Sequence, residues 1–349
     1  MSDQLRLDEA NLPDYLAKLD LLPPGEKLRV EPAGEGNINW VRRVRAPRSG
    51  RSLVVKQARP ALERFPEYRV STERIVFEAR YYETVRPLDR EGICPQVLWF
   101  DAAQRVLVLE DLGAAERLDA ALARGADVGP VVRALGAFLG AVHAATGADA
   151  GRPLAGRFAN DEMRRLHGDH IFQLPYRAND FPLSEALRDT ARAIWRDGRL
   201  RARIDAAYTR YLEPEGALLH ADVQPTNVLL APGGPKLLDA EIAHVGDPAF
   251  DVGVLVGHLV LWGVAGSGAA QARAAVERTW SAYAEAHGPR ELPPFEAVAL
   301  YAGIEVLRRT IGAARVAAVE NDRAALAAVE AGLRLVAAPP SSPAALIPA

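Results

Sequence analysis

The stretch LLHADVQPTNVLL at residues 218–230, followed by KLLDAE at residues 236–241, decides the fold of this chain. It places His-x-Asp first, then an Asn five residues after that Asp, and finally Asp-x-Glu behind a second apolar run. The apolar runs 228–230 and 236–238 predict two short strands of a hairpin. A hairpin would bring the polar loop before it beside the Asp-x-Glu turn after it, and strand alternation would point both carboxylates of that turn to one side.

These side chains suit phosphoryl transfer from ATP. Such a transfer needs a carboxylate that accepts the proton of the attacking hydroxyl, and hard oxygen ligands for Mg²⁺. We predict that Asp222 is this base. The predicted metal ligands are Asn227, Asp239 and Glu241. Each of them alone is more simply explained as a polar loop residue, whereas the ordered set favours a catalytic site; His220 is expected to be structural.

The first 111 residues predict a small antiparallel sheet with one main helix. Strands are expected near residues 28–31, 38–44, 52–56, 97–100 and 105–109, a short helix at 7–19 and a longer one at 72–88. Lys56 then lies on a strand and Glu78 on the helix that follows it. We predict that Lys56 holds the α- and β-phosphates of ATP and that Glu78 orients it.

Two backbone segments of this half are further candidates for nucleotide binding. Residues 33–37 form a glycine-containing turn, in which the N–H groups of Gly34 and Gly36 would approach phosphates, although an ordinary hairpin turn is equally open. Adenine is expected against the backbone of Glu110 and Leu112, where the chain leaves the sheet. The chain contains no Gly-x4-Gly-Lys-Ser/Thr, which excludes a P-loop enzyme.

From Leu112 onward the sequence is strongly helical. Helices are expected at residues 131–144, 184–212, 269–287 and 295–335. The predicted fold class is therefore α+β, two-lobed and protein-kinase-like, with an N-lobe at 1–111 and a mainly helical C-lobe at 112–336. Residues 337–349, rich in Pro, Ser and Ala, are expected to form a flexible tail.

Composition is that of an ordinary globular protein. Charged residues make up 25% of the chain and the net charge is −3, without a basic block that would suit nucleic acid or a membrane surface. The apolar run 252–264 is interrupted by glycines and a histidine, so no membrane span is predicted, and no secretory signal is apparent. Cys94 is the only cysteine, which excludes an intrachain disulfide. We expect a cytoplasmic protein.

These motifs together resemble the aminoglycoside phosphotransferase/choline kinase superfamily, and within it the methylthioribose kinases. Three further segments carry the closer resemblance: GNINWV at 36–41, VKQARP at 55–60 and LRRTIG at 307–312. The resemblance implies ATP and Mg²⁺ as cofactors, the C1 hydroxyl of 5-methylthioribose as acceptor, a role in methionine salvage, and a homodimer. It also implies that Asn37 and Asn39 contact nucleotide. Arg308 and Arg309 would stabilise charge at the reacting phosphate or bind sugar hydroxyls.

The chain departs from that family at three places, and the acceptor stays open. The family has Gly where Ala221 stands, a Ser in the region of Asn227, and Asp-Pro-Glu at 239–241. A related 5-deoxypentose or another small sugar is one alternative to methylthioribose.

Two other functions are also considered. An aminoglycoside or amino-alcohol kinase, of the choline type, would favour an acidic acceptor pocket rather than paired arginines. An inactive kinase-fold binding module would be expected to lose one of the key residues. The segment His167–His170 is interpreted as a polar loop rather than a metal site, and Asp251 as a brace of the catalytic loop and a helix cap.

Overall fold

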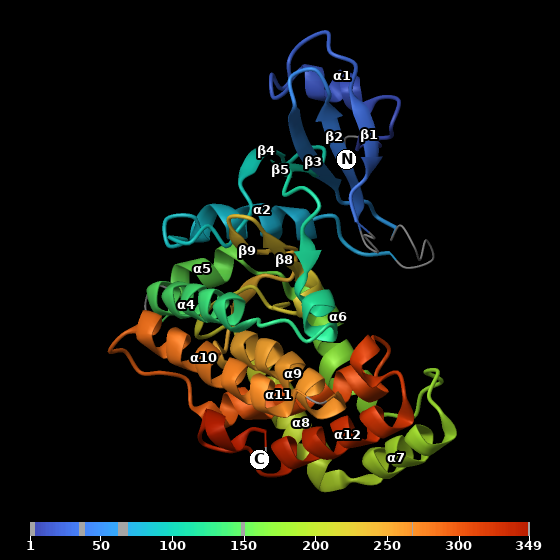
Figure 1. Ribbon diagram of the computed structural model, residues 1–349, viewed down its shortest axis with the longest axis vertical. Coiled ribbons are helices and arrows are strands. Elements are labelled where there is room, and N and C mark those ends of the chain that lie inside the picture. The colour runs from blue at the N-terminus through green and yellow to red at the C-terminus, as the bar shows by residue number, and fades with distance from the viewer. Residues whose placement is uncertain (1–3, 35–38, 62–68, 148–150, 267, 348–349) are drawn as a thin grey trace. The chain divides into compact units, whose positions relative to one another are not determined.

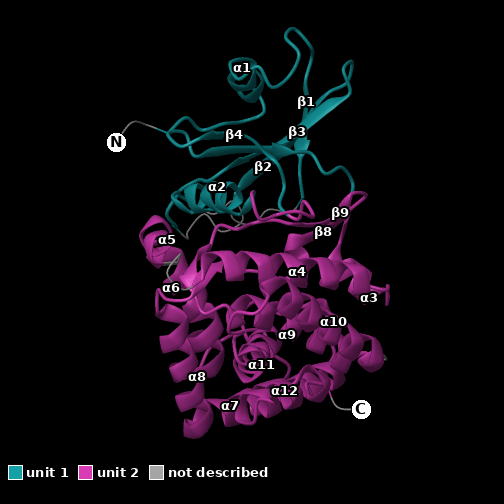
Figure 2. Cartoon of the chain, turned by 90° about the vertical axis from the view of Figure 1, so that its left-hand side faces the viewer, with its two compact units in different colours: residues 1–86, 94–114 teal, residues 87–93, 115–349 magenta. Residues whose placement is uncertain are grey.

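The structure, a computed structural model, describes residues 4–34, 39–61, 69–147, 151–266 and 268–347. The chain divides into two compact units (Figure 2). Unit 1 contains residues 1–86 and 94–114, and unit 2 contains residues 87–93 and 115–349. The boundary thus differs from the one predicted at 111/112. Residues 87–93 join unit 2 because Leu237 donates its backbone N–H to the carbonyl of Ile93, at 2.8 Å.

Unit 1 is built on a five-stranded antiparallel sheet with the order β1-β2-β3-β5-β4 (Figure 1). Its strands are β1 Arg29–Pro32, β2 Trp40–Ala46, β3 Arg51–Gln57, β4 Val97–Asp101 and β5 Val106–Glu110, and its helices are α1 Leu12–Ala17 and α2 Arg74–Val85. Apolar residues of α1 pack with Trp40, Val44, Leu53 and Val55 of the sheet in one buried cluster. The predicted sheet and helix are therefore confirmed.

Unit 2 is mainly helical (Figures 1 and 2). Its α-helices are α3 Leu118–Ala123, α4 Gly129–Thr146, α5 Gly151–Arg157, α6 Asp161–Gly168, α7 Glu185–Arg196, α8 Gly198–Leu212, α9 Ala249–Ala265, α10 Ala269–His287, α11 Phe295–Ile311 and α12 Asp322–Ala337. Helices α4 and α10 approach closely, since a Cβ atom at Gly140 would lie 2.3 Å from the carbonyl oxygen of Tyr283. Only glycine permits this contact.

Two long predicted helices are each divided in the structure. The predicted helix 184–212 is α7 and α8, because the Asp197 side chain accepts the N–H groups of Arg199 and Leu200 and starts a new helix there. The predicted helix 295–335 is α11 and α12, with an irregular segment and a short 3₁₀ turn at Ala317–Val319 between them. Both breaks depend on local polar contacts that helical periodicity does not reveal.

The short strands of unit 2 hold residues 218–230 and 236–241 together. Strands β8 Val228–Ala231 and β9 Gly234–Leu237 form the predicted antiparallel hairpin, and β6 Glu116–Arg117 pairs with β8. Strand β7 Ala217–Leu219 pairs antiparallel with β10 His244–Gly246, so the polar loop and the Asp-x-Glu segment are tied together at both ends. The β10 strand was not predicted.

The last described residues of the expected tail are held against unit 2. Leu346 and Ile347 are buried, and their carbonyl oxygens accept hydrogen bonds from Arg334 at 2.7 Å and from Arg273 at 3.1 Å. Apolar side chains at these two positions outweigh the loop-like composition around them.

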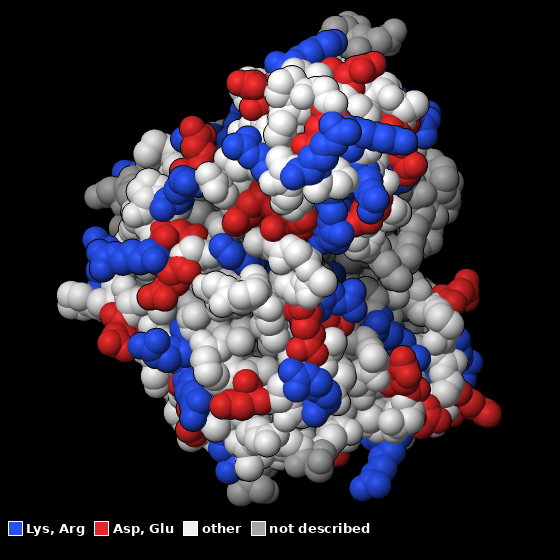
Figure 3. All heavy atoms as spheres, turned by 45° about the horizontal axis from the view of Figure 1, so that its top comes forward, with Lys and Arg blue, Asp and Glu red and all other residues white. Residues whose placement is uncertain are grey.

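Two expectations from composition can be compared with the structure. The run 252–264 lies within α9, and in the described part of the chain no helix is long and apolar enough to cross a membrane. Acidic and basic side chains are interspersed over the face drawn in Figure 3.

Candidate active site

The carboxylate of Asp222 is held by two amide side chains of its own loop. The Nδ2 atom of Asn227 donates to Asp222 Oδ2 at 2.7 Å and to the Asp222 carbonyl at 3.0 Å. The Nε2 atom of Gln224 donates to the same Oδ2 at 2.8 Å. The Asp222 side chain is 14% exposed. Asp222 is thus a fixed acceptor that remains partly accessible, as a general base must be.

Asp251 braces the backbone of this loop from the first turn of α9. Its two carboxylate oxygens accept the N–H groups of His220 and Ala221, both at 2.8 Å, and its side chain is fully buried. Burial alone would raise the pKa of Asp251, but hydrogen bonds from His143 and the loop backbone lower it overall. The expected loop brace is confirmed; α9 starts two residues earlier, so Asp251 does not cap it.

Ala221 adopts a left-handed backbone conformation, with φ of +67°. This region favours glycine, because a Cβ atom crowds the backbone there. Alanine at this position therefore adopts the left-handed conformation at a cost in backbone strain. The hydrogen bond to Asp251 helps to hold Ala221 in that conformation.

His220 is structural, as expected. Its Nδ1 accepts the N–H of Asp222 at 3.3 Å and its side chain is buried. Burial lowers the pKa of His220, which the nearby carboxylates of Asp251, Asp222 and Asp239 only partly offset. The carboxylates of Asp222 and Asp239 thus act on the same imidazole.

The Asp-x-Glu segment is bound to the hairpin but is not a strand. Leu238 donates its N–H to the carbonyl of Asn227 at 2.8 Å, whereas Asp239 has a φ of +65° and lies beyond the end of β9. The prediction from strand alternation is therefore wrong for this turn. Glu241 is buried, and its carbonyl accepts a bond from Asn160 at 2.9 Å. Metal binding by these residues stays a prediction.

The donor set fits magnesium. In the described residues, no three His, Cys, Asp or Glu side chains are grouped as a complete metal site. Mg²⁺ bound to a nucleotide needs only one or two protein carboxylates, because phosphates and water complete its shell. The side-chain Nδ2 of Asn227 donates to Asp222. The side-chain Oδ1 of Asn227 therefore points away from Asp222. Asp239 and Glu241 supply the carboxylates of the predicted set.

Arg308 and Arg309 share one buried acid on α11. Glu305 accepts from Arg308 Nη1 at 3.0 Å and from Arg309 Nε at 2.6 Å, and His258 Nε2 lies 3.2 Å from it. Burial alone would raise the pKa of Glu305, but the two arginines hold it well below its ordinary value. Glu305 was not predicted, although its i, i+3 and i+4 spacing to the arginines is a helical ion-pair pattern.

Arg309 also contacts the loop that carries Asp222. Its Nη2 donates to Gln224 Oε1 at 2.7 Å, and Gln224 in turn donates to Asp222. The Asp222 carboxylate also acts on Arg308, whose pKa is lowered by burial and by Arg309 and partly restored by Glu305 and Asp222. The structure thus brings both predicted arginines to the predicted base.

The predicted lysine–glutamate pair forms within unit 1. Lys56 Nζ on β3 lies 2.7 Å from Glu78 Oε2 on α2, and the two side chains are 5% and 1% exposed. Tyr82 donates its hydroxyl to the other oxygen of Glu78, at 3.2 Å. The two residues therefore form an ion pair. The orienting role of Glu78 and phosphate binding by Lys56 stay predictions.

The other residues predicted for nucleotide binding have mixed placements. Gly34 lies in a bend with φ of +77°, and Gly36 and Asn37 lie outside the described residues. The Oδ1 atom of buried Asn39 accepts two bonds from Arg74, at 2.8 and 3.1 Å, which gives Asn39 a structural task. Glu110 is the last residue of β5, and its Oε1 accepts the N–H of Gln96. Leu112, two residues later, is half-buried. Their nucleotide contacts stay predictions.

One residue close to Asp222 was missed. His167, at the end of α6, has its Nε2 4.0 Å from Asp222 Oδ1. The interpretation of its segment as a polar loop is wrong, since His167 is a buried helical residue. No local sequence motif links it to the catalytic loop.

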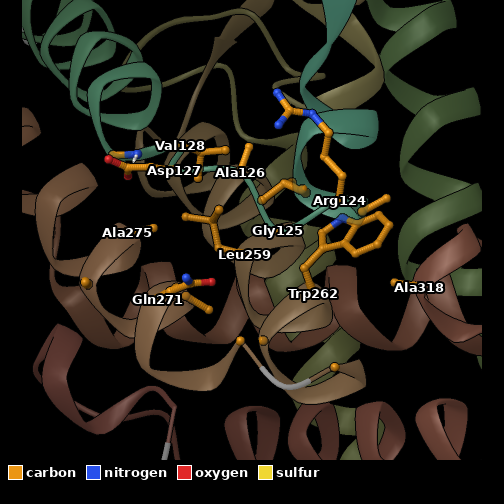
Figure 4. Close-up of a pocket in the computed structure, with 18 of the residues that line it drawn as sticks. Arg124, Gly125, Ala126, Asp127, Val128, Leu259, Trp262, Gln271, Ala275 and Ala318 are labelled. Atoms are coloured by element: carbon orange, nitrogen blue, oxygen red, sulfur yellow. Dashed lines mark hydrogen bonds between the residues drawn. The ribbon is translucent and has the colours of Figure 1, made fainter.

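A cavity of about 580 Å³ lies elsewhere in unit 2. It is lined by the turn between α3 and α4, the second half of α9 and the start of α10, with Leu259 and Trp262 among its residues (Figure 4). None of the predicted site residues lines it, so it is separate from the candidate active site.

Comparison with known proteins shows the family of this chain. The phosphotransferase enzyme family matches residues 29–288, which is more than half of the chain. This chain belongs to that family. It is therefore a phosphotransferase that modifies a hydroxyl group of a small molecule, as the sequence predicts.

Curated relatives extend over most of the chain. A methylthioribose kinase of Geobacillus sp. (strain WCH70) is 27% identical, with 94% of this chain and 90% of that protein covered. One of Bacillus velezensis is 27% identical, with 90% of this chain and 86% of that protein covered. The predicted resemblance is confirmed.

Solved structures confirm the fold class. A choline kinase from Streptococcus pneumoniae has a TM-score of 0.53 at 17% identity and covers 94% of this chain and 98% of its own. A choline kinase from Cryptosporidium parvum has a TM-score of 0.57 at 12% identity, with 94% of this chain and 95% of its own covered. At such identities the likeness concerns the kinase-like fold alone.

Proposed function

We propose that this protein is an ATP-dependent sugar kinase that phosphorylates the C1 hydroxyl of 5-methylthioribose or of a related 5-deoxypentose. The observation that carries the proposal is the held carboxylate of Asp222, bound by Asn227 and Gln224 and linked through Gln224 to Arg309. The relatives named methylthioribose kinase, which cover nearly the whole chain, support the choice of acceptor.

In this proposal, unit 2 activates the acceptor. Asp222 orients the sugar hydroxyl and takes its proton as the oxygen attacks the γ-phosphorus in line. Arg308 and Arg309 stabilise the negative charge that spreads as the bond to ADP breaks. Their guanidinium groups are buried and fixed by Glu305, so little reorganisation is needed at that moment.

The remaining residues hold the nucleotide. Lys56, oriented by Glu78, binds the α- and β-phosphates, and the backbone around Gly34, Glu110 and Leu112 lies against the nucleotide. Asn227, Asp239 and Glu241 hold Mg²⁺. The metal, when bound, neutralises charge on the phosphate oxygens.

The charge of the site favours a sugar over an amino acceptor. Two buried arginines stand beside Asp222, and one buried acid, Glu305, serves both of them. A cationic acceptor such as choline or an aminoglycoside would favour an acidic acceptor pocket rather than one with paired arginines. An acceptor rich in hydroxyl oxygens would meet hydrogen-bond donors instead.

The proposal is tested by ADP release with a panel of acceptors: 5-methylthioribose, 5-deoxyribose, ribose, choline and kanamycin. We expect the highest kcat/KM with 5-methylthioribose or 5-deoxyribose, and a requirement for Mg²⁺. Preferred turnover of choline or kanamycin would overturn the choice of acceptor. No turnover together with absent nucleotide binding would instead support an inactive binding module.

The family resemblance also implies a homodimer, and we propose that form. Light scattering coupled to size-exclusion chromatography measures the mass directly, and a mass near one chain, 37.7 kDa, would contradict it.

A further inference from the structure

Two buried polar atoms face each other at the proposed base without a hydrogen-bond partner among the described residues. They are Asp222 Oδ1 and His167 Nε2, which lie 4.0 Å apart. A buried polar atom without a partner costs about 1–3 kcal/mol, so such a pair calls for an explanation. The other carboxylate oxygen of Asp222 already carries the bonds from Asn227 and Gln224.

The tautomer of His167 follows from its second ring nitrogen. His167 Nδ1 lies 3.4 Å from the hydroxyl of Tyr211 on α8. Burial raises the pKa of Tyr211 far above its ordinary value, so the phenol keeps its proton and can donate it to Nδ1. The proton of the neutral imidazole is then on Nε2. The opposite tautomer would place the lone pair of Nε2 against a carboxylate oxygen, which is repulsive.

His167 also stays neutral. Burial lowers its pKa well below the ordinary value, and the positive charge of Arg308 acts in the same direction. His167 is therefore a hydrogen-bond donor to Asp222 rather than the cationic half of an ion pair.

The surroundings hold this arrangement in place. The ring of Tyr211 packs against Phe250 at 4.8 Å and against Phe172 at 5.2 Å between centroids. The His167 ring meets Phe250 edge to face, with centroids 6.3 Å apart. Each of the two facing atoms has less than 1 Å² of accessible surface. An acceptor hydroxyl therefore does not reach Oδ1 here, and a small approach of the two side chains would complete a direct bond.

We infer that His167 is a positioning residue for the base, and that Tyr211, His167 and Asp222 form a hydrogen-bond relay that fixes the Asp222 carboxylate during phosphoryl transfer. This inference rests on the proposed function, in which Asp222 is the base. The relay engages Oδ1, so the proton of the acceptor hydroxyl passes to the Oδ2 side of the carboxylate.

Two substitutions separate the donor from the shape of the side chain. His167→Phe keeps a planar ring and removes the donor, whereas His167→Gln keeps an N–H near the position of Nε2. We expect His167→Phe to lower kcat by about 10–100-fold with KM for ATP nearly unchanged, as is common when an orienting partner is lost. His167→Gln should recover most of this loss. His170→Gln, in an exposed residue three positions along, is the matched control and should leave kcat unchanged.

Equal losses in the Phe and Gln variants would overturn the inference, as would a loss confined to KM and to the unfolding midpoint. Asp222→Asn separates the two hypotheses. Wild-type activity in Asp222→Asn defeats the proposed function itself, whereas an inactive Asp222→Asn beside a fully active His167→Phe defeats only the relay. In the Asp222→Asn background, His167→Phe should give no additional loss.

A second measurement does not depend on activity. Nitrogen-15 NMR of the histidine rings in the wild-type protein distinguishes the tautomers, with the His167 signals assigned from the His167→Gln spectrum. We expect a proton on Nε2 and none on Nδ1 at neutral pH. A proton on Nδ1, or on both nitrogens, would contradict the relay.

Discussion

The two units each bury an ionic group, but the balance of charge differs. In unit 1, Lys56 and Glu78 form an ion pair at 2.7 Å. In unit 2, Glu305 alone faces two arginines, and Arg309 continues to Gln224 beside Asp222. In unit 1, one carboxylate faces one amine. The cluster in unit 2 has one more cation than anion, and Arg309 is linked through Gln224 to the carboxylate of the proposed base.

This difference indicates two kinds of task. A balanced pair positions one amine, although burying the pair costs desolvation that the attraction only partly repays. An unbalanced cluster keeps its second cation available for a negative charge that arises during the reaction.

The largest effect is expected when the shared acid is removed. Glu305→Gln leaves two buried guanidinium groups without their carboxylate, and we expect the free energy of unfolding to fall by about 3–5 kcal/mol. Urea titration followed by circular dichroism measures it. Glu320→Gln, at an exposed acid outside the cluster, is the control and should change little.

Removing both members of an ion pair should affect stability differently in the two units. Lys56→Met with Glu78→Leu deletes both charges, and such replacements are often close to neutral. Glu305→Gln with Arg308→Met still leaves Arg309 buried, so we expect this double variant to be about 2 kcal/mol less stable than the first. If the two double variants are equally stable, the charges of the cluster in unit 2 are as well compensated as those of the pair in unit 1.

Mild acid should weaken unit 2 first, because all seven histidines lie in it. Burial, reinforced by Arg164, lowers the pKa of His244 to about 4. A lowered histidine pKa contributes stability above the unfolded value of about 6.5, and this is lost as the pH falls toward about 4. From pH 7 to pH 5 we expect on the order of 2 kcal/mol from His244 alone.

Hydrogen exchange at the two pH values locates this effect, after correction for the intrinsic pH dependence of exchange. Faster exchange in unit 2 with unit 1 unchanged is the expected result. A loss of protection in both units alike would contradict the assignment to the buried histidines.

The smallest effect concerns the link between the cluster and the base. Gln224→Met keeps the size of the side chain but breaks the path from Arg309 to Asp222, and we expect kcat to fall about tenfold, or about 1.4 kcal/mol. Thr226→Val, at an exposed position of the same loop, is the control. An unchanged kcat in Gln224→Met would show that Arg309 acts without Gln224.

Much of this site is predictable because its parts are local in sequence. The spacing from Asp222 to Asn227, followed by a hairpin, specifies a loop that folds back on itself, and Asn227 does bond to Asp222. Lys56 and Glu78 were predictable because a strand and the next helix pack together.

The missed features depend on contacts between distant segments. His167 on α6 and Tyr211 on α8 come together only through packing, and no periodicity marks them. The positive φ of Asp239 could not be predicted from its residue type. The buried tail shows the same limit, since Leu346 and Ile347 find their places only against the finished helices.

The central claim is that Asp222 is the base of a phosphotransferase, and single-turnover transfer from ATP to 5-methylthioribose tests it most directly. With Asp222→Asn, the account predicts a chemical step slower by about 10²–10⁴-fold while the affinity for ATP stays unchanged. A chemical step at the wild-type rate in that variant would contradict it.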